Sequence, residues 1–339
     1  MEPERTVIGC DIGGTKVAAA LLRGRLPEPG ARTLAEVETP AVLERFTAPT
    51  DGSSAEACIG GVEECLARLV SSVGTVDAIG VGVASCVDYD AGRVVHSVNL
   101  PLGDVSLRDE LGRAFGVPVA LDNDATAATV GEHTYGAGVG VREMLMLTLG
   151  TGVGGGIVCG GRPYRGVSGA AAELGHVTLD IDGPECPADC PNRGCLEAYV
   201  AGPAMGAAAR AAAEAEPGSG LGRALAAGAP VDGPLLSRLA LAGDPVAVAV
   251  LTRIGALLGA GLTTLVNVFN PELIVIGGGA AQAGELLLGP ARRVIAERAL
   301  PPARDQVRVT AAALGSDAGL MGAAALALAR LDGRRAGPS

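Results

Sequence analysis

The sequence predicts an α/β protein with two domains. The chain has 339 residues, 48% of them hydrophobic, which is enough for about two separate cores. Two segments, residues 6–22 and 144–159, share one pattern in which a glycine-rich turn joins two apolar strands. The segments begin about 140 residues apart, and a unit that recurs in this way indicates a duplicated structure.

Composition limits the partners and the compartment. A net charge of −11 disfavours nucleic acid and anionic membranes, and with four Tyr, three Phe and no Trp there are few rings on which bases could stack. The N-terminus carries acidic residues, so no signal peptide is predicted. The apolar stretch 246–269 contains Arg253 and several Gly and is expected to be a core helix rather than a membrane span. We therefore expect a cytoplasmic protein with reduced cysteines.

The first glycine-rich turn has the composition of a phosphate site. Paired glycines allow backbone N–H groups to turn toward an anion, and a nearby carboxylate could hold Mg²⁺ through water. A strand follows the turn, which excludes a Walker A loop and a Rossmann fingerprint, because both lead into a helix. A hairpin turn without a ligand is the alternative. The candidate residues are Asp11, Gly13, Gly14, Thr15 and Lys16.

The second glycine-rich turn follows a strand predicted at 144–149 and precedes one predicted at 157–159. Two such turns that face one cleft can hold the two ends of a polyphosphate, so the pair is more specific than either turn alone. The candidate residues in this turn are Gly150, Thr151, Gly152 and Gly154.

A candidate general base follows a short strand predicted at 117–121. The strand ends in Asp122-Asn123-Asp124, and a helix begins there. A carboxylate at the carboxyl end of a parallel strand lies where open α/β sheets bind ligands, and deprotonation of a hydroxyl needs such a base. Alternatively, Asp122 or Asp124 caps the helix.

A candidate metal site lies between residues 169 and 197. One imidazole and three thiolates form a closed tetrahedral set typical of structural zinc, and its members are His176, Cys186, Cys190 and Cys195. The alternatives are a disulfide pair or scattered thiols, but three local Cys beside a His favour the metal. The metal would fix Glu173 and Glu197 against a small polar substrate. The other five Cys are expected in cores.

Hydrophobic periodicity places the remaining elements. We expect strands at 43–48, 78–84 and 272–276, helices at 56–73, 202–214, 234–242 and 244–269, and a Gly turn at Gly315 that leads into a final helix at about 318–331. Asp244-Pro245 forms a cap and first-turn pair for the longest helix. Residues 332–339 are expected to be disordered.

Several of these motifs resemble those of the ROK family, which comprises sugar kinases and sugar-responsive repressors. The resemblance rests on Glu173-Leu-Gly-His176 and on the Cys cluster ending in Gly-Cys195-Leu-Glu197. Asn99-Leu100 is similar to a motif whose Asn binds sugar hydroxyls, although a turn Asn is the alternative. Asn123-Asp124 matches part of an Asn-Asp-Ala-Asn motif that contains the catalytic base. The run 270–279, with Gly278 and Gly279, resembles the adenosine-side motif.

The chain departs from the family pattern in four places. Cys186 and Cys190 are separated by three residues instead of one. Ser85 stands where the family commonly has a Gly that lies against the sugar. Thr126 replaces the second Asn of the catalytic motif, and the segment 24–54 is longer than its counterpart.

The resemblance implies an actin-like ATPase (ribonuclease H-like) fold with an interdomain cleft. The expected domains are residues 1–120 and 121–317, with the helix 318–331 packed on the first. The implied enzyme is a glucokinase of glycolysis that transfers a phosphoryl group from Mg-ATP to the C6 hydroxyl of glucose. Asp124 would accept the proton, and the sugar would be held by Asn99, Asn123, Asp124, Glu173, His176 and Glu197. A homodimer or a dimer of dimers is expected by analogy.

Other functions compete with this interpretation. An N-acetylglucosamine or N-acetylmannosamine kinase would use the same mechanism. A repressor needs a DNA-binding domain, and the acidic charge and the ten residues before Asp11 disfavour it. A sugar sensor without turnover is disfavoured by Asp124 and the two turns. Polyphosphate as donor is disfavoured by the turn at 154–156.

Overall fold

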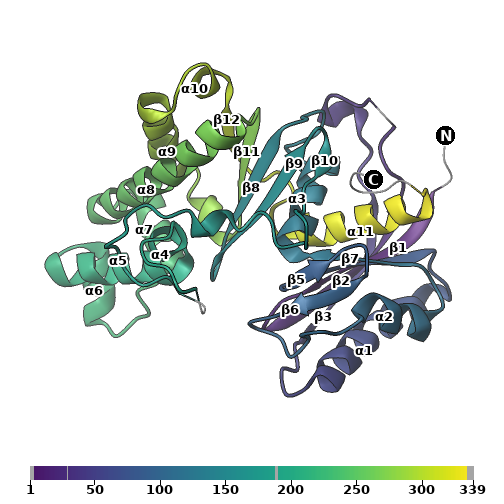
Figure 1. Ribbon diagram of the computed structural model, residues 1–339. Helices are drawn as coiled ribbons and strands as arrows, with labels where there is room; N and C mark the ends of the chain where they lie inside the picture. The colour runs from purple at the N-terminus through teal and green to yellow at the C-terminus, as the bar shows by residue number, and fades with distance from the viewer. Residues whose placement is uncertain (1–3, 29, 188–189, 334–339) are drawn as a thin grey trace. The chain divides into compact units, whose positions relative to one another are not determined.

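The computed structural model describes residues 4–28, 30–187 and 190–333 (Figure 1). The chain divides into two compact units. Unit 1 comprises Met1–Met144, Gly156–Ala172 and Ala313–Ser339, and unit 2 comprises Leu145–Gly155 and Glu173–Ala312. This division differs from the expected boundary at residue 120, because residues 121–144 pack within unit 1. Most of the tail expected at 332–339 lies outside the described residues.

Unit 1 contains a five-stranded sheet with the order β3-β2-β1-β4-β7. The central strand β1 pairs antiparallel with β2 and parallel with β4, which is in turn parallel to β7. The five strands are β1 (Arg5–Ile12), β2 (Lys16–Gly24), β3 (Ala41–Pro49), β4 (Ala78–Val83) and β7 (Val119–Asn123). A two-stranded antiparallel ribbon, β5 (Cys86–Asp88) and β6 (Arg93–His96), follows β4.

Both faces of this sheet are covered by helices (Figure 1). Because side chains alternate across a strand, Ile8 and Cys10 pack with α1 and α2, whereas Val7 packs with α3 and α11. The helices are α1 (Ala55–Val73), α2 (Leu107–Phe115), α3 (Asp124–Tyr135) and α11 (Ala318–Leu331). Two hydrophobic cores therefore flank the sheet, one on each face.

The helix α11 lies directly on the sheet because two strand residues have no side chain. A Cβ built on Gly9 would overlap the carbonyl of Leu320, and a Cβ on Gly80 would overlap the carbonyl of Ala323. This close approach fixes the start of α11, near Gly319, against Asp11 at the end of β1.

A second five-stranded sheet has the order β10-β9-β8-β11-β12. Counted along the chain, both sheets place their strands in the order third, second, first, fourth, fifth, which confirms the predicted duplication. Gly154, predicted in the second turn, instead lies within a strand. The strands are β8 (Met144–Leu149), β9 (Val153–Cys159), β10 (Arg162–Pro163), β11 (Leu273–Gly277) and β12 (Arg308–Ala311).

The helices of unit 2 surround α8 (Pro245–Phe269). Asp244 caps this helix by accepting the Ala247 N–H at 2.9 Å, and Asn270 ends it with a φ of 46°. By length and composition alone α8 could cross a membrane. It packs against the helices around it, as expected of a core helix. These are α4 (Glu197–Val200), α5 (Gly202–Ala215), α6 (Gly220–Ala226), α7 (Gly233–Leu241), α9 (Glu285–Arg298) and α10 (Ala303–Gln306).

Four short 3₁₀ helices complete the described structure. They are η1 (Leu34–Glu36), η2 (Leu174–His176), η3 (Gly279–Ala283) and η4 (Gly315–Asp317). The long segment 24–54 contains η1 and β3, and it is tied to α3 by Tyr135, whose hydroxyl donates to the Arg25 carbonyl at 3.1 Å.

Candidate active site

Three candidate segments of unit 1 meet at the carboxyl edge of its sheet. The register pairs Ile12 with Val83 and Val83 with Asn123. The glycine turn after β1, the residues after β4 and Asp124 after β7 therefore lie side by side. Ligands of open α/β sheets bind at such an edge.

The first glycine turn is closed by backbone bonds and presents its tip outward. The Gly13 N–H donates to the Lys16 carbonyl at 3.0 Å, and the Thr50 hydroxyl donates to the Gly13 carbonyl at 2.7 Å. Gly14, Thr15 and Lys16 are exposed, so their donors are accessible to an anion.

Asn99 lies against this turn. A Cβ built on Gly14 would come within 3.3 Å of the Asn99 Cβ, an approach that a larger residue would disturb. Asn99 is exposed, so its amide is accessible to a ligand beside the turn.

Asn123, rather than either aspartate, caps helix α3. Its Oδ1 accepts the Thr126 N–H at 3.0 Å, so the alternative in which Asp122 or Asp124 caps the helix is wrong. Its Nδ2 donates to Asp124 Oδ1 at 3.0 Å and to the Ser85 carbonyl at 3.3 Å. The cap therefore also orients the neighbouring carboxylate.

Asp124, the first residue of α3, is held by two hydrogen bonds on one oxygen. Oδ1 accepts both the Asn123 amide and the Ala125 N–H, the latter at 2.8 Å. Burial raises the pKa of Asp124, and these hydrogen bonds oppose the shift. Both of these hydrogen bonds fall on Oδ1.

The charge of Asp124 acts on the carboxylate of Asp11. Burial and the charge of Asp124 raise the pKa of Asp11 to about 6, against the opposing charge of Lys16. Two carboxylates that repel each other beside this exposed turn suit a divalent cation, which would relieve the repulsion.

A buried ion pair supports the strand end that carries this site. Arg165 binds Oδ2 of Asp122 through Nε at 2.9 Å and Nη2 at 2.7 Å, and its guanidinium lies 3.9 Å from the centroid of the Tyr89 ring. Asp122 is 2% exposed. Arg165 could not be predicted from the sequence, because no local pattern links residues so far apart in the chain.

In unit 2, Glu197 holds the second glycine turn. Its Oε2 accepts the Val153 N–H at 2.6 Å, and a Cβ built on Gly152 would come within 2.8 Å of the same oxygen. Glu197 is 6% exposed. The carboxylate predicted to hold a sugar therefore binds the backbone of the turn.

A cavity of about 1050 Å³ opens beside this turn. Gly150 and Thr151 line it together with Gly279, whereas Gly278, predicted beside it, does not. Such a volume and a largely apolar wall suit a nucleoside whose phosphates extend toward the turn. The other lining residues lie mainly on α5 and α7 and include Pro203, Met205, Arg210, Val231, Asp232, Pro234, Ser237 and Arg238.

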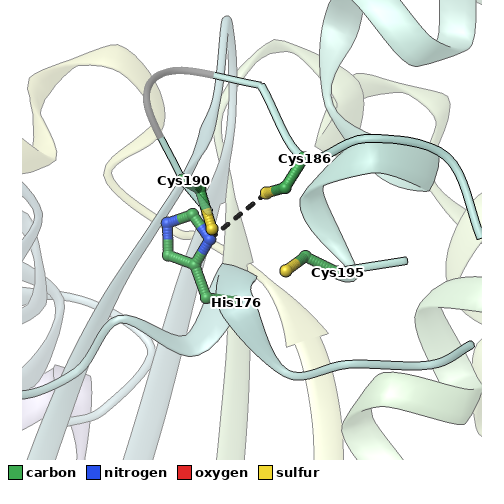
Figure 2. Close-up of side chains that lie close together, drawn as sticks. All are labelled: His176, Cys186, Cys190 and Cys195. Atoms are coloured by element: carbon green, nitrogen blue, oxygen red, sulfur yellow. Dashed lines mark hydrogen bonds between the residues drawn. The ribbon is translucent and has the colours of Figure 1, made fainter. Parts of the chain in front are cut away.

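The four predicted metal ligands converge, as Figure 2 shows. Their ligand atoms all lie within 4.8 Å of one another, and Nδ1 of His176 is 3.4 Å from the Cys186 sulfur. The unusual spacing of Cys186 and Cys190 therefore does not keep Cys190 out of the cluster. Burial and the neighbouring thiols raise the pKa of Cys186, a penalty that a bound cation would reverse.

The two ring nitrogens of His176 face different groups. While Nδ1 faces the thiols, Nε2 lies 3.7 Å from Oε2 of Glu173, whose side chain is 68% exposed. One imidazole can therefore bind a metal on one side and a polar group on the other. Outside the cluster, Cys10, Cys58 and Cys65 are buried as predicted, whereas Cys159 is exposed.

The duplicated sheets, each with a glycine turn between its first two strands, define the actin-like ATPase fold, and the fold class expected from the sequence is confirmed. Residues 7–330 match the ROK family, and the chain belongs to this family.

Relatives of known structure or activity cover almost the whole chain. A glucokinase of Halalkalibacterium halodurans is 34% identical over 94% of this chain and 94% of its own length. The crystal structure of a ROK family glucokinase from Streptomyces griseus, in complex with glucose and AMPPNP, is 35% identical, covers 95% of this chain and 99% of that chain, and has a TM-score of 0.78. These relatives belong to the enzyme class expected from the sequence, the ATP-dependent hexose kinases.

The family also contains proteins with another function. A putative xylose repressor of a Caldicellulosiruptor species is 35% identical, but the match covers 74% of this chain and 62% of the repressor.

Proposed function

We propose that this protein is a glucokinase, which transfers the γ-phosphoryl group of ATP to the C6 hydroxyl of glucose. The observation that carries the proposal is the position of Asp124, a half-buried carboxylate that accepts the Asn123 amide at 3.0 Å and lies at the same sheet edge as the first glycine turn, against which Asn99 packs. The similarity to glucokinases along the whole chain supports this substrate.

Asp124 is the general base in this mechanism. Oδ2 accepts the proton of the sugar hydroxyl as its oxygen attacks the γ-phosphorus, and the bond from that phosphorus to the bridging oxygen of ADP breaks. The raised pKa of Asp124 favours this task, because a base works best when its pKa approaches the working pH. Hydrogen bonds on Oδ1 keep the carboxylate oriented throughout.

The remaining polar groups bind and orient. Asn99 and Asn123 hold the sugar hydroxyls near Asp124, and Glu173, His176 and Glu197 provide further polar contacts to the sugar. The exposed turn at Gly14, Thr15 and Lys16 donates to phosphate oxygens. When bound, Mg²⁺ would neutralise phosphate charge, and Asp11 would hold it through water. In unit 2, the cavity beside Gly150 and Thr151 takes the nucleoside.

The cluster of His176, Cys186, Cys190 and Cys195 holds zinc in this proposal. One nitrogen and three sulfurs form a closed set, which is typical of a structural rather than a catalytic site. The zinc would fix the loop that carries Glu173 and position Nε2 of His176.

The zinc proposal is tested with His176→Ala. Metal analysis of the purified variant should show loss of zinc, and the KM for glucose should rise. Cys159→Ser, which changes an exposed thiol outside the cluster, is the matched control and should alter neither. Full zinc content in His176→Ala would show that the imidazole is not a ligand.

The function is tested by ADP release with Mg-ATP and glucose, N-acetylglucosamine, N-acetylmannosamine or fructose in parallel. Turnover on glucose that disappears in Asp124→Asn is expected. Turnover on an N-acetyl sugar alone would support the same mechanism with Asp124 as base, but would show that the substrate is an N-acetylhexosamine rather than glucose. No turnover on any sugar, with zinc and sugar binding retained, would overturn the kinase proposal and favour a sensor.

A further inference from the structure

Ser85 occupies the centre of the edge at which the candidate site of unit 1 lies. It follows β4, the strand between β1 and β7, and the preceding residue is fixed because the Ala84 N–H donates to the Ile12 carbonyl at 2.9 Å. Ser85 is 7% exposed, although it is a polar residue at a strand end. A buried hydroxyl in this position needs a partner.

That partner is a second serine. The Ser85 hydroxyl donates to Oγ of Ser97 at 2.7 Å, and the same Oγ of Ser97 accepts the Leu100 N–H at 3.2 Å. The serine pair therefore ties the end of β4 to the turn that contains Asn99.

The backbone of Ser85 connects the serine pair to Asn123. Its carbonyl accepts Nδ2 of Asn123 at 3.3 Å, while Oδ1 of the same amide caps α3. Three hydrogen bonds and the covalent backbone of Ser85 thus connect the Asn99 turn, through Ser97 and Ser85, to Asn123.

We propose that Ser85 and Ser97 are positioning residues for sugar recognition, which set the placement of Asn99 relative to Asn123. In this proposal neither serine contacts the sugar or transfers a proton. The inference rests on the proposed function, in which these two asparagines bind the sugar hydroxyls. Loss of either hydroxyl should loosen the sugar site and leave the nucleotide cavity, which lies wholly in unit 2, unaffected.

Ser85→Ala, Ser97→Ala and the double variant test this proposal. Each single change should raise the KM for glucose about fivefold to thirtyfold, because it leaves a shielded polar group without its partner. The KM for ATP should stay within about twofold of the wild-type value. The double variant should be no worse than the worse single variant, because both changes break one chain of bonds. Ser97→Thr, which retains the hydroxyl, should rescue glucose binding.

Ser71→Ala is the matched control, since its exposed hydroxyl donates to the Arg68 carbonyl within its own helix. It should change neither KM value. If Ser85→Ala does not fold, Ser97→Ala against Ser97→Thr carries the same test at a half-buried position.

The proposal is overturned if the alanine variants bind glucose as the wild type does, or if the KM for ATP rises equally. Either outcome leaves the glucokinase function standing. A wild-type protein that neither binds nor phosphorylates any sugar, measured by calorimetry and ADP release, overturns the function and this proposal together.

Discussion

Arg165 forms a buried ion pair with Asp122, two residues before the proposed catalytic residue Asp124. Their closest atoms are 2.7 Å apart, and the two side chains are 11% and 3% exposed. Burial raises the pKa of Asp122, and the guanidinium opposes this shift. The Asp122 carboxylate also accepts the Asn123 N–H at 3.0 Å, so the pair supports the backbone that carries Asp124.

Arg165→Met should destabilise the protein by about 3–5 kcal/mol, because it leaves the Asp122 charge buried without a partner. Urea unfolding measures this loss. The double variant Asp122→Asn/Arg165→Met should recover part of the stability, since no unpaired charge remains. Arg93→Ala is the control, because its ion pair with Asp104 is exposed and should contribute about 1 kcal/mol or less. Equal effects of the two arginine changes would contradict a special role for Arg165.

Two glycines of unit 1 should respond oppositely to alanine. At Gly80 a Cβ would overlap the Ala323 carbonyl of α11, so Gly80→Ala should cost about 3 kcal/mol or more. At Gly60, inside the exposed part of α1, a Cβ would meet nothing within 4 Å, and Gly60→Ala should stabilise by about 0.5–1 kcal/mol. Thermal unfolding compares the two, and a lower melting temperature for Gly60→Ala would contradict the helix argument.

Local patterns predicted much of this fold and site. Residues close together in the sequence define three of the predicted features. These are the turn at Gly13, the strand before Asp124 and the cluster of Cys. The helix α9 had no prediction, and Pro290 inside it is a residue that normally interrupts a helical pattern. The Ser85–Ser97 pair and Arg165 could not be predicted, because they depend on contacts between distant segments.

The domain boundary shows the same limit. From the sequence we expected the domain boundary at residue 120, which lies within the strand β7. In the structure α3 packs on α11, nearly two hundred residues later in the chain, so the segment after β7 stays with unit 1. The packing of α3 on α11 and on strands of the first sheet decides this.

The stability of the protein without Mg²⁺ should fall as the pH rises from about 4 to 6. Asp11 has a raised pKa of about 6 in the folded state, so in this window the folded protein retains a proton that the unfolded chain has released. Asp11→Asn removes this titration, so its stability should fall less than that of the wild type between pH 4.5 and 6.5. Urea unfolding at several pH values measures both slopes, and parallel slopes would show that Asp11 is not perturbed.

Two variants of Glu197 can distinguish a sugar contact from a structural role at the second glycine turn. Its Oε2 binds the Val153 N–H, so Glu197→Ala should loosen the turn at Gly150–Gly152 and raise the KM for ATP about tenfold. Glu197→Gln keeps an oxygen acceptor and should leave the KM for ATP nearly unchanged. If Glu197 also contacts the sugar, the KM for glucose should rise in both variants. A KM for ATP that is unchanged in Glu197→Ala would mean that the turn keeps its shape without this carboxylate, and that the role of Glu197 lies with the sugar alone.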